Sequence, residues 1–250
     1  MGKTTTSLRG RGAADNPPNR FERIHVEVDA QEAHERAAEP VDTVFLRDAS
    51  RSLVVFNDSP DVGYDAGINP YRGCAHGCAY CYARPSHEYL GFSAGLDFET
   101  KILVKEDAPE LLARTLAAPR WKPQTIGMSG NTDPYQPAER ALKLTRRCLE
   151  LLAEFRNPVT VITKGYLVTR DIDLFASLAE HRAAAVTISV TTLDNGLHRI
   201  MEPRASAPAR RLEAIRQLAA AGVPVGVNVA PVLPGLTDHE LPAILEARSE

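Results

Sequence analysis

The chain has 250 residues, of which 44% are hydrophobic and 24% are charged, and its formal net charge is −3. This composition is typical of a globular protein, excludes a disordered or fibrous chain, and gives no whole-chain attraction to nucleic-acid phosphates. No apolar run approaches the roughly 20 residues that span a bilayer, so no membrane segment is expected. Four cysteines and no secretory signal predict a reducing, cytoplasmic location.

The first 60 residues are expected to form a flexible N-terminal extension, and residues 61–250 a single domain. Up to about Pro40 the chain carries glycines, an Asn-Pro-Pro run and mixed charges without helical or strand periodicity. Basic residues open this stretch and acidic residues follow closely. A solvated tail is therefore favoured over a basic arm that binds nucleic acid.

Three of the four cysteines, Cys74, Cys78 and Cys81, lie in one short run with C-x-x-x-C-x-x-C spacing. Three thiolates leave one iron of a 4Fe-4S cluster open to a small molecule, as a reactive cluster requires. Gly73 and Gly77 give the loop the backbone freedom to bring the thiolates together. The alternative is a structural zinc site completed by His76 or His87, in a non-catalytic binding protein.

From Pro123 onward, short apolar runs alternate with longer amphipathic runs. The apolar runs predict strands at residues 125–128, 159–163, 185–191 and 223–229, and their near-continuous apolar character is that of parallel strands covered on both faces. This rhythm leaves an open doubly wound sheet or a full or partial β/α barrel, and in both of these folds function gathers where the strands end.

The helices between the strands carry start and stop signals. Asp107 and Glu110 resemble a capping box, Asp171 precedes an apolar face, and a helix is expected to open at Pro208 and close at Gly222. Another is expected over about residues 138–155. It carries Cys148 among its leucines, so we interpret that cysteine as a partly buried structural residue.

The cysteine motif, the aromatic Tyr80 before its last cysteine and the β/α repeats together resemble the radical S-adenosylmethionine (SAM) superfamily. The resemblance is to its spore photoproduct lyase-like branch and covers roughly residues 65–245. It also rests on the residues after the strands: 129–133, Thr163-Lys164, Ser189, Glu202-Pro203 and 229–231. The fold that this implies is α/β, a partial (β/α) barrel of the radical SAM type.

The resemblance implies a 4Fe-4S cluster bound by the three cysteines, with S-adenosyl-L-methionine on the fourth iron and its adenine near Tyr80. Lys164 would pair with the methionine carboxylate, and Ser189 would face the same cofactor. Further cofactor-binding candidates are Asn131, Asp133 and Asn228. The sequence does not identify a catalytic residue.

The implied activity is lyase-like: SAM is cleaved reductively to a 5′-deoxyadenosyl radical, which abstracts hydrogen from an unidentified substrate. An electron donor of flavodoxin or ferredoxin type is the expected partner. Fold analogy points to nucleic acid as the substrate class.

Two departures from the pattern bear on this reading. Gly130 stands where photoproduct-repairing lyases have a hydrogen-donating cysteine, so a different reaction is expected. The sixth strand of the barrel is expected to be absent. The predicted strand from Val223, which corresponds to the fifth strand of that barrel, would then have an unpaired edge and an exposed inner face.

Overall fold

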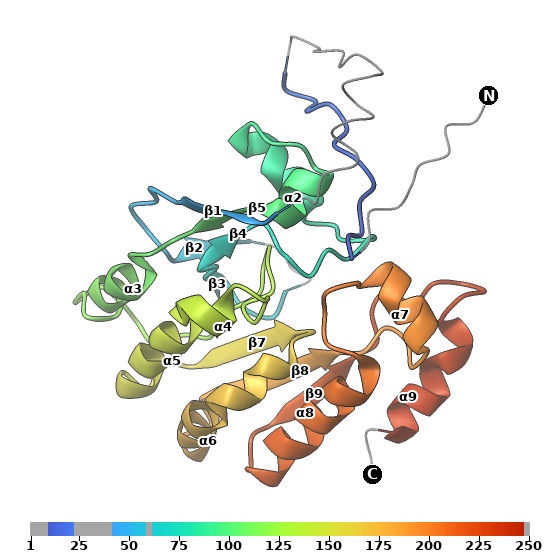
Figure 1. Ribbon diagram of the computed structural model, residues 1–250. Coiled ribbons are helices and arrows are strands. Elements are labelled where there is room, and N and C mark those ends of the chain that lie inside the picture. Colours follow the sequence, from blue (N-terminus) through green and yellow to red (C-terminus); the bar gives the residue numbers. More distant parts are fainter. Residues whose placement is uncertain (1–9, 23–41, 59–61, 248–250) are drawn as a thin grey trace, which may run out of the picture.

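The computed structural model describes residues 10–22, 42–58 and 62–247. Its larger sheet has six strands in the order β2-β3-β6-β7-β8-β9 (Figure 1). All neighbouring pairs from β3 to β9 are parallel, and β2 is antiparallel to β3. These strands are Val55–Phe56, Ala66–Gly67, Ile126–Gly127, Val159–Thr163, Ala184–Ser189 and Val225–Asn228.

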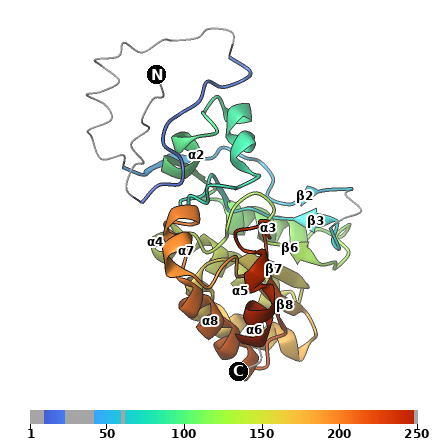
Figure 2. The same cartoon turned by 90° about the vertical axis from the view of Figure 1, so that its right-hand side faces the viewer.

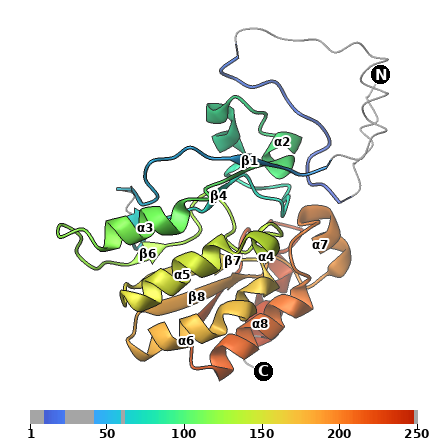
Figure 3. The same ribbon diagram turned by 60° about the vertical axis from the view of Figure 1, so that its left-hand side comes forward.

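One face of this sheet is covered by a row of amphipathic helices, of which α5, α6 and α8 lie in front of the strands in Figure 3. Their leucine, isoleucine and phenylalanine side chains form the main core together with the valines of β7 and β8. The helices that follow the parallel strands are α5 Leu144–Glu154, α6 Ile172–Glu180 and α8 Pro208–Ala220, with α3 Ala108–Leu116 beside α5. The sheet does not close on itself, which confirms the partial barrel.

The four strands expected from the sequence are confirmed within a few residues, and so is the helix from Pro208. Gly222, at φ 75°, follows its last turn. The helix expected over residues 138–155 is instead two helices, α4 Glu139–Leu142 and α5, separated by Lys143 at φ 53°. The break lets the buried Glu139 carboxylate accept hydrogen bonds from the backbone N–H groups of Thr145 and Arg146.

Neither expected acidic cap forms. Asp107 makes no side-chain bond at the start of α3, and its carboxylate pairs with Arg47 at 3.3 Å. Asp171 is fully buried and binds Arg146 and Tyr135 at 2.9 and 3.0 Å. Ion pairs from other segments thus outcompete local capping at both positions.

Sequence periodicity gave no strand before residue 123, yet the described residues there contain five strands. A smaller sheet has the order β1-β5-β4. β3 begins the parallel array with only two residues, too few to show a pattern. The elements of this part are β1 Val44–Arg47, β4 Tyr71–Arg72, β5 Lys101–Val104, the short α2 Leu96–Thr100 and the 3-10 helix η1 Arg84–Leu90.

The expectation of a flexible extension over residues 1–60 does not hold for its described parts. They include β1 and β2, and residues 10–22 lie along η1 and α2 (Figure 2). The amide of Asn19 donates to two backbone carbonyls of residues 88–92, and that of Asn16 donates to Asp97. Residues 23–41 of the extension lie outside the described residues, and the boundary at residue 60 stays a prediction.

β9 is the last strand in the described part of the chain and forms one edge of the larger sheet. All four of its residues are half-exposed, in line with the expected open edge. Beyond it lie the 3-10 helix η3 Asp238–Glu240 and α9 Leu241–Ala247; earlier in the chain are η2 Tyr166–Asp171 and α7 Asn195–Met201. Within residues 10–22, 42–58 and 62–247, no helix is long and apolar enough to cross a bilayer.

A buried ion-pair network fixes the segment between β6 and η2. Glu139, fully buried, accepts hydrogen bonds from the Tyr71 hydroxyl at 2.5 Å and from Arg170 at 2.7 Å. Arg170 also pairs with Asp171. The network therefore joins the small sheet, α4 and η2 through one carboxylate.

We expect Glu139→Gln to lower the free energy of unfolding by about 3 kcal/mol, because the buried network loses the carboxylate charge that pairs with Arg170. Urea denaturation measures this. Glu150→Gln, which removes a half-exposed carboxylate that pairs with Arg146 at 3.2 Å, is the matched control and should change it by less than about 1 kcal/mol. Equal effects of the two substitutions would contradict the role given to Glu139.

Candidate functional site

The carboxyl ends of the parallel strands and the cysteine loop enclose one pocket of about 440 Å³. The loop follows β4, and the other walls come from the residues after β6, β7, β8 and β9. Every site residue expected from the sequence lines this pocket: Cys74, Cys78, Tyr80, Cys81, Asn131, Asp133, Lys164, Ser189 and Asn228. Residues separated by as much as 154 positions are thus brought together because parallel strands end at the same edge of a sheet.

The cysteine loop has no strand or helix of its own and is held by a buried amide. Gln136, fully buried, accepts a hydrogen bond from the Ala75 N–H at 3.0 Å and donates to the Gly73 carbonyl at 3.1 Å. Two backbone bonds add to this clamp, from the Cys74 N–H to Phe98 and from the Ala79 N–H to Met201. Gln136 thus orders the turn that presents the first cysteine.

A second clamp on the loop comes from Arg84, whose guanidinium donates two hydrogen bonds to the Cys78 carbonyl, at 3.1 and 2.9 Å. Buried Glu99 pairs with Arg84 at 2.5 Å and accepts hydrogen bonds from the backbone N–H groups of Gly12 and Ala13. A Cβ on Gly77, which has φ 66°, would lie 2.5 Å from the Glu99 carboxylate. Glycine is needed here both for the left-handed backbone and for this close approach.

The three cysteines are free thiols in the described part of the chain. Burial raises the pKa of Cys74 well above its usual value. Burial also raises the pKa of Cys78 to about 12, although the nearby Lys164 acts in the opposite direction. Thiolates at these positions therefore need a positively charged group bound among them, which a metal centre supplies.

Asp133 is engaged by the protein through both carboxylate oxygens. They accept hydrogen bonds from the Thr163 hydroxyl at 2.6 Å and the Lys164 N–H at 2.7 Å, and the Nδ1 atom of His76 lies 3.2 Å away. Burial acts to raise the pKa of Asp133, but His76 and these hydrogen bonds lower it to about 2. Its carboxylate ties the end of β7 to the cysteine loop.

Four polar side chains, by contrast, make no hydrogen bond within the described residues: those of Asn131, Lys164, Ser189 and Asn228. Ser189 and Asn228 are direct partners in the β8–β9 register. The Lys164 ammonium lies 5.7 Å from the centre of the Tyr80 ring. The pocket therefore offers hydroxyl, amide and ammonium groups beside an aromatic ring, a set suited to a zwitterionic ligand with a heterocycle.

Tyr80 is held by a buried ion pair. Its hydroxyl donates to Glu202, which accepts a further hydrogen bond from Thr191 at 2.8 Å and pairs with Arg211 at 2.5 Å. Arg211 also donates to the Ser189 carbonyl at 3.0 Å. Burial acts to raise the pKa of Glu202, but Arg211 lowers it, so the carboxylate stays charged and fixes the ring.

A cluster fits these residues better than a single metal ion. In the described ranges, no three His, Cys, Asp or Glu side chains gather around a point that one ion would occupy. His87, one of the two histidines considered for zinc, donates from Nε2 to the Lys101 carbonyl at 2.9 Å and packs on Phe98. Three cysteines around a pocket mouth match the donor set of an open iron–sulfur cluster.

The sequence analysis missed the residues that position the site. These are Gln136, Glu99, Arg84 and Arg211; it considered His76 only as a zinc ligand and quoted Glu202 only for its order in the chain. Their partners lie up to 87 positions away, so no local spacing signals them. Cys148, expected to be partly buried, is fully buried in α5 and lies outside the pocket.

Comparison with protein-family models decides the family. The model of the radical SAM superfamily matches residues 68–247. The chain belongs to the radical SAM superfamily. That family implies a 4Fe-4S cluster and SAM as cofactors.

Curated relatives are similar in sequence, and each of those described here is named as an uncharacterized protein. An uncharacterized protein of Mycobacterium tuberculosis (strain ATCC 25618 / H37Rv) is 43% identical over 171 residues, which cover 68% of this chain and 50% of the relative. An uncharacterized protein of Methanocaldococcus jannaschii is 30% identical over 173 residues, with coverage of 69% and 62%. The chain spans about half the length of the Mycobacterium relatives.

Solved structures of spore photoproduct lyase share the fold of this radical SAM protein. A variant with bound AdoMet and dinucleoside spore photoproduct has a TM-score of 0.56 at 20% identity, over 82% of this chain and 58% of that chain. Another, with dinucleoside spore photoproduct, has a TM-score of 0.59 at 18% identity, over 82% and 57%. At these identities the likeness shows the fold alone.

We expect Gln136→Leu to lower the free energy of unfolding by about 3 kcal/mol, since two buried backbone groups lose their partners. The Ala75 amide should also lose its protection against hydrogen exchange. Urea denaturation and hydrogen exchange measure these effects. Gln217→Leu, which alters a half-exposed amide on α8, is the control. Retained protection of the Ala75 amide in Gln136→Leu would show that this residue does not hold the loop.

Proposed function

We propose that this chain is a radical SAM enzyme whose cluster is held by Cys74, Cys78 and Cys81 and whose pocket binds S-adenosyl-L-methionine. The observation that supports it is the gathering of the three thiols and the unsatisfied polar groups around one pocket. The superfamily membership of residues 68–247 supports it independently.

When bound, the cluster and SAM supply reductive cleavage of the sulfonium to a 5′-deoxyadenosyl radical that abstracts hydrogen from substrate. The chain's own residues bind and orient. Lys164 offers its ammonium to the methionine carboxylate, and Ser189 and Asn228 offer a hydroxyl and an amide from adjacent strands. Tyr80, its hydroxyl bound to Glu202, offers a fixed ring face to the adenine.

Asp133 acts in this proposal as a positioning residue. Its two oxygens already accept hydrogen bonds from Thr163, the Lys164 backbone and the Tyr135 backbone. It therefore sets the direction of Lys164 and the place of His76. Asn131 is exposed and lines the pocket, where its amide offers a donor and an acceptor to the cofactor.

We extend the proposal to the partners and substrate class. Reduction of the cluster needs a low-potential donor, for which a flavodoxin or ferredoxin type is suited, and thiol-ligated clusters favour a reducing cytoplasm. The related structures that hold a dinucleoside spore photoproduct make nucleic acid the first substrate class to test. Gly130, rather than a cysteine, lies between the lining residues Ser129 and Asn131 and argues for a reaction other than photoproduct repair.

We expect Cys78→Ala to abolish the charge-transfer absorbance and the iron content of anaerobically reconstituted protein, because two remaining thiolates cannot retain the cluster. Cys148→Ala, which removes a buried thiol of α5, should keep about four irons per chain. Colourless protein that carries one zinc would instead support the zinc-stabilised binding protein. Full iron in Cys78→Ala would contradict the ligand assignment.

We expect Lys164→Ala to weaken SAM binding about 10-fold while leaving the iron content unchanged, because a charged hydrogen-bond donor to the carboxylate is lost. Equilibrium binding on the reconstituted protein measures this. Lys143→Ala, which removes an exposed lysine between α4 and α5, is the matched control. An unaltered affinity in Lys164→Ala would remove that residue from the site.

A further inference from the structure

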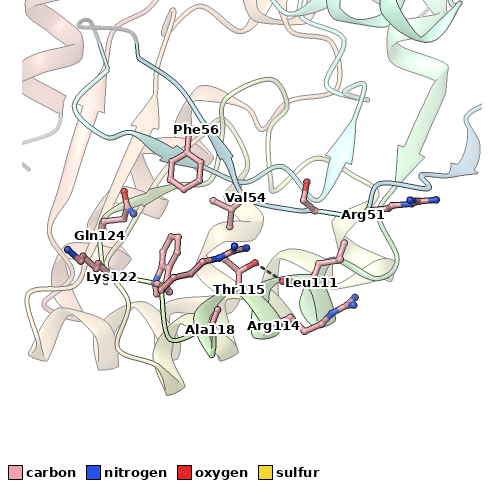
Figure 4. Close-up of a pocket in the computed structure, with 12 residues that line it drawn as sticks. Arg51, Val54, Phe56, Leu111, Arg114, Thr115, Ala118, Lys122 and Gln124 are labelled. Carbon is pink, nitrogen blue, oxygen red and sulfur yellow. Dashed lines mark hydrogen bonds between the residues drawn. The ribbon is translucent and has the colours of Figure 1, made fainter.

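A second pocket has a volume of about 620 Å³, and Figure 4 shows the side chains that line it. It is formed between the segment that leads into β2 on one side and α3 with the loop that follows it on the other. None of its lining residues contributes to the candidate site described above. Its chemistry is accordingly not explained by the proposed function.

The charge of this pocket is one-sided. Arg51, Arg114, Arg120 and Lys122 line it, and no lining residue is acidic. In the described residues none of these four cations pairs with a carboxylate; only the Nε of Arg114 donates to a carbonyl of its own helix, at 3.3 Å. Many other arginines of the chain are in ion pairs, and the chain as a whole is negative. Four uncompensated cations around one hollow form a local anion site.

Aromatic surface lies between these cations. Phe56 is 66% exposed, which is unusual for a side chain of its size, and it faces the hollow. Trp121 is fixed by a hydrogen bond from its indole N–H to Asn157 at 3.0 Å. Figure 4 shows Arg51 and Arg114 toward one end of the pocket and Lys122 toward the other, with Phe56 on the wall above.

We infer that this pocket binds single-stranded nucleic acid, with a base against Phe56 and Trp121 and the flanking phosphates on the four cations. Aromatic faces beside a positive groove are the combination that such strands require. Cations at both ends match phosphates on both sides of a base. A duplex keeps its bases stacked inside, so the aromatic wall selects the single strand.

The inference goes beyond the proposed function, since it concerns a separate site and does not depend on cluster or SAM. It does bear on that function, because a strand held here would tether a nucleic-acid substrate to the same molecule. The two proposals fail separately: loss of the cluster leaves this pocket intact, and loss of these cations leaves the cysteines intact.

The test is fluorescence anisotropy of the full chain with labelled oligothymidylate of about 15 nucleotides. We expect Arg114→Gln/Lys122→Gln to weaken binding about 10-fold and to reduce the slope of log affinity against log salt by about 1.4. Phe56→Ala should weaken binding by a similar factor. The matched controls are Arg140→Gln/Arg156→Gln and Phe155→Ala, which alter exposed residues outside both pockets and should bind as the wild type does.

Several results would overturn the inference. They are no binding of the oligonucleotide by the wild-type chain, equal loss in the control variants, and equal or tighter binding of a duplex of the same length. Competition by thymidine monophosphate as strong as by the oligonucleotide would also overturn it, because a mononucleotide site would not need cations at both ends. Circular dichroism of each variant confirms that the fold is retained.

Discussion

The cysteine loop has no regular structure of its own, so its shape depends on hydrogen bonds from side chains buried around it. Gln136 bonds the backbone on both sides of Cys74, and Glu99 pairs with Arg84, which donates to the Cys78 carbonyl. Both groups are fully buried, where an unmade hydrogen bond is costly. These buried hydrogen bonds therefore hold the loop rigidly against the surrounding core.

That rigidity is transmitted from the barrel by a few charged side chains. Glu139 fixes the segment that carries Gln136 and Asp133, and the Glu202–Arg211 pair fixes Tyr80 and the end of β8. The ends of the parallel strands then supply the polar groups that face the pocket. The irregular cysteine loop, which follows β4 of the smaller sheet, thus lies against the ends of four strands of the larger sheet.

The sequence predicted which residues gather around the pocket, but not the residues that support them. The cysteines are adjacent in the chain, and Lys164, Ser189 and Asn228 lie at the ends of apolar strands, so local spacing and periodicity identify them. Gln136 and Glu99 act across long separations, which no periodicity records. Strands of two residues such as β3 are too short to show a sequence pattern. Asp107 and Asp171 do not cap helices as expected, because their carboxylates form ion pairs with arginines that are adjacent only in the folded chain.

Membership of the radical SAM superfamily, the partial barrel and the shared pocket support the central proposal that this chain cleaves SAM reductively. The most direct measurement is the formation of 5′-deoxyadenosine when the reconstituted protein is incubated with SAM and a strong reductant without oxygen. The account predicts its formation by the wild-type chain even without a substrate. Protein that contains a full cluster and binds SAM, yet forms no 5′-deoxyadenosine, would contradict it.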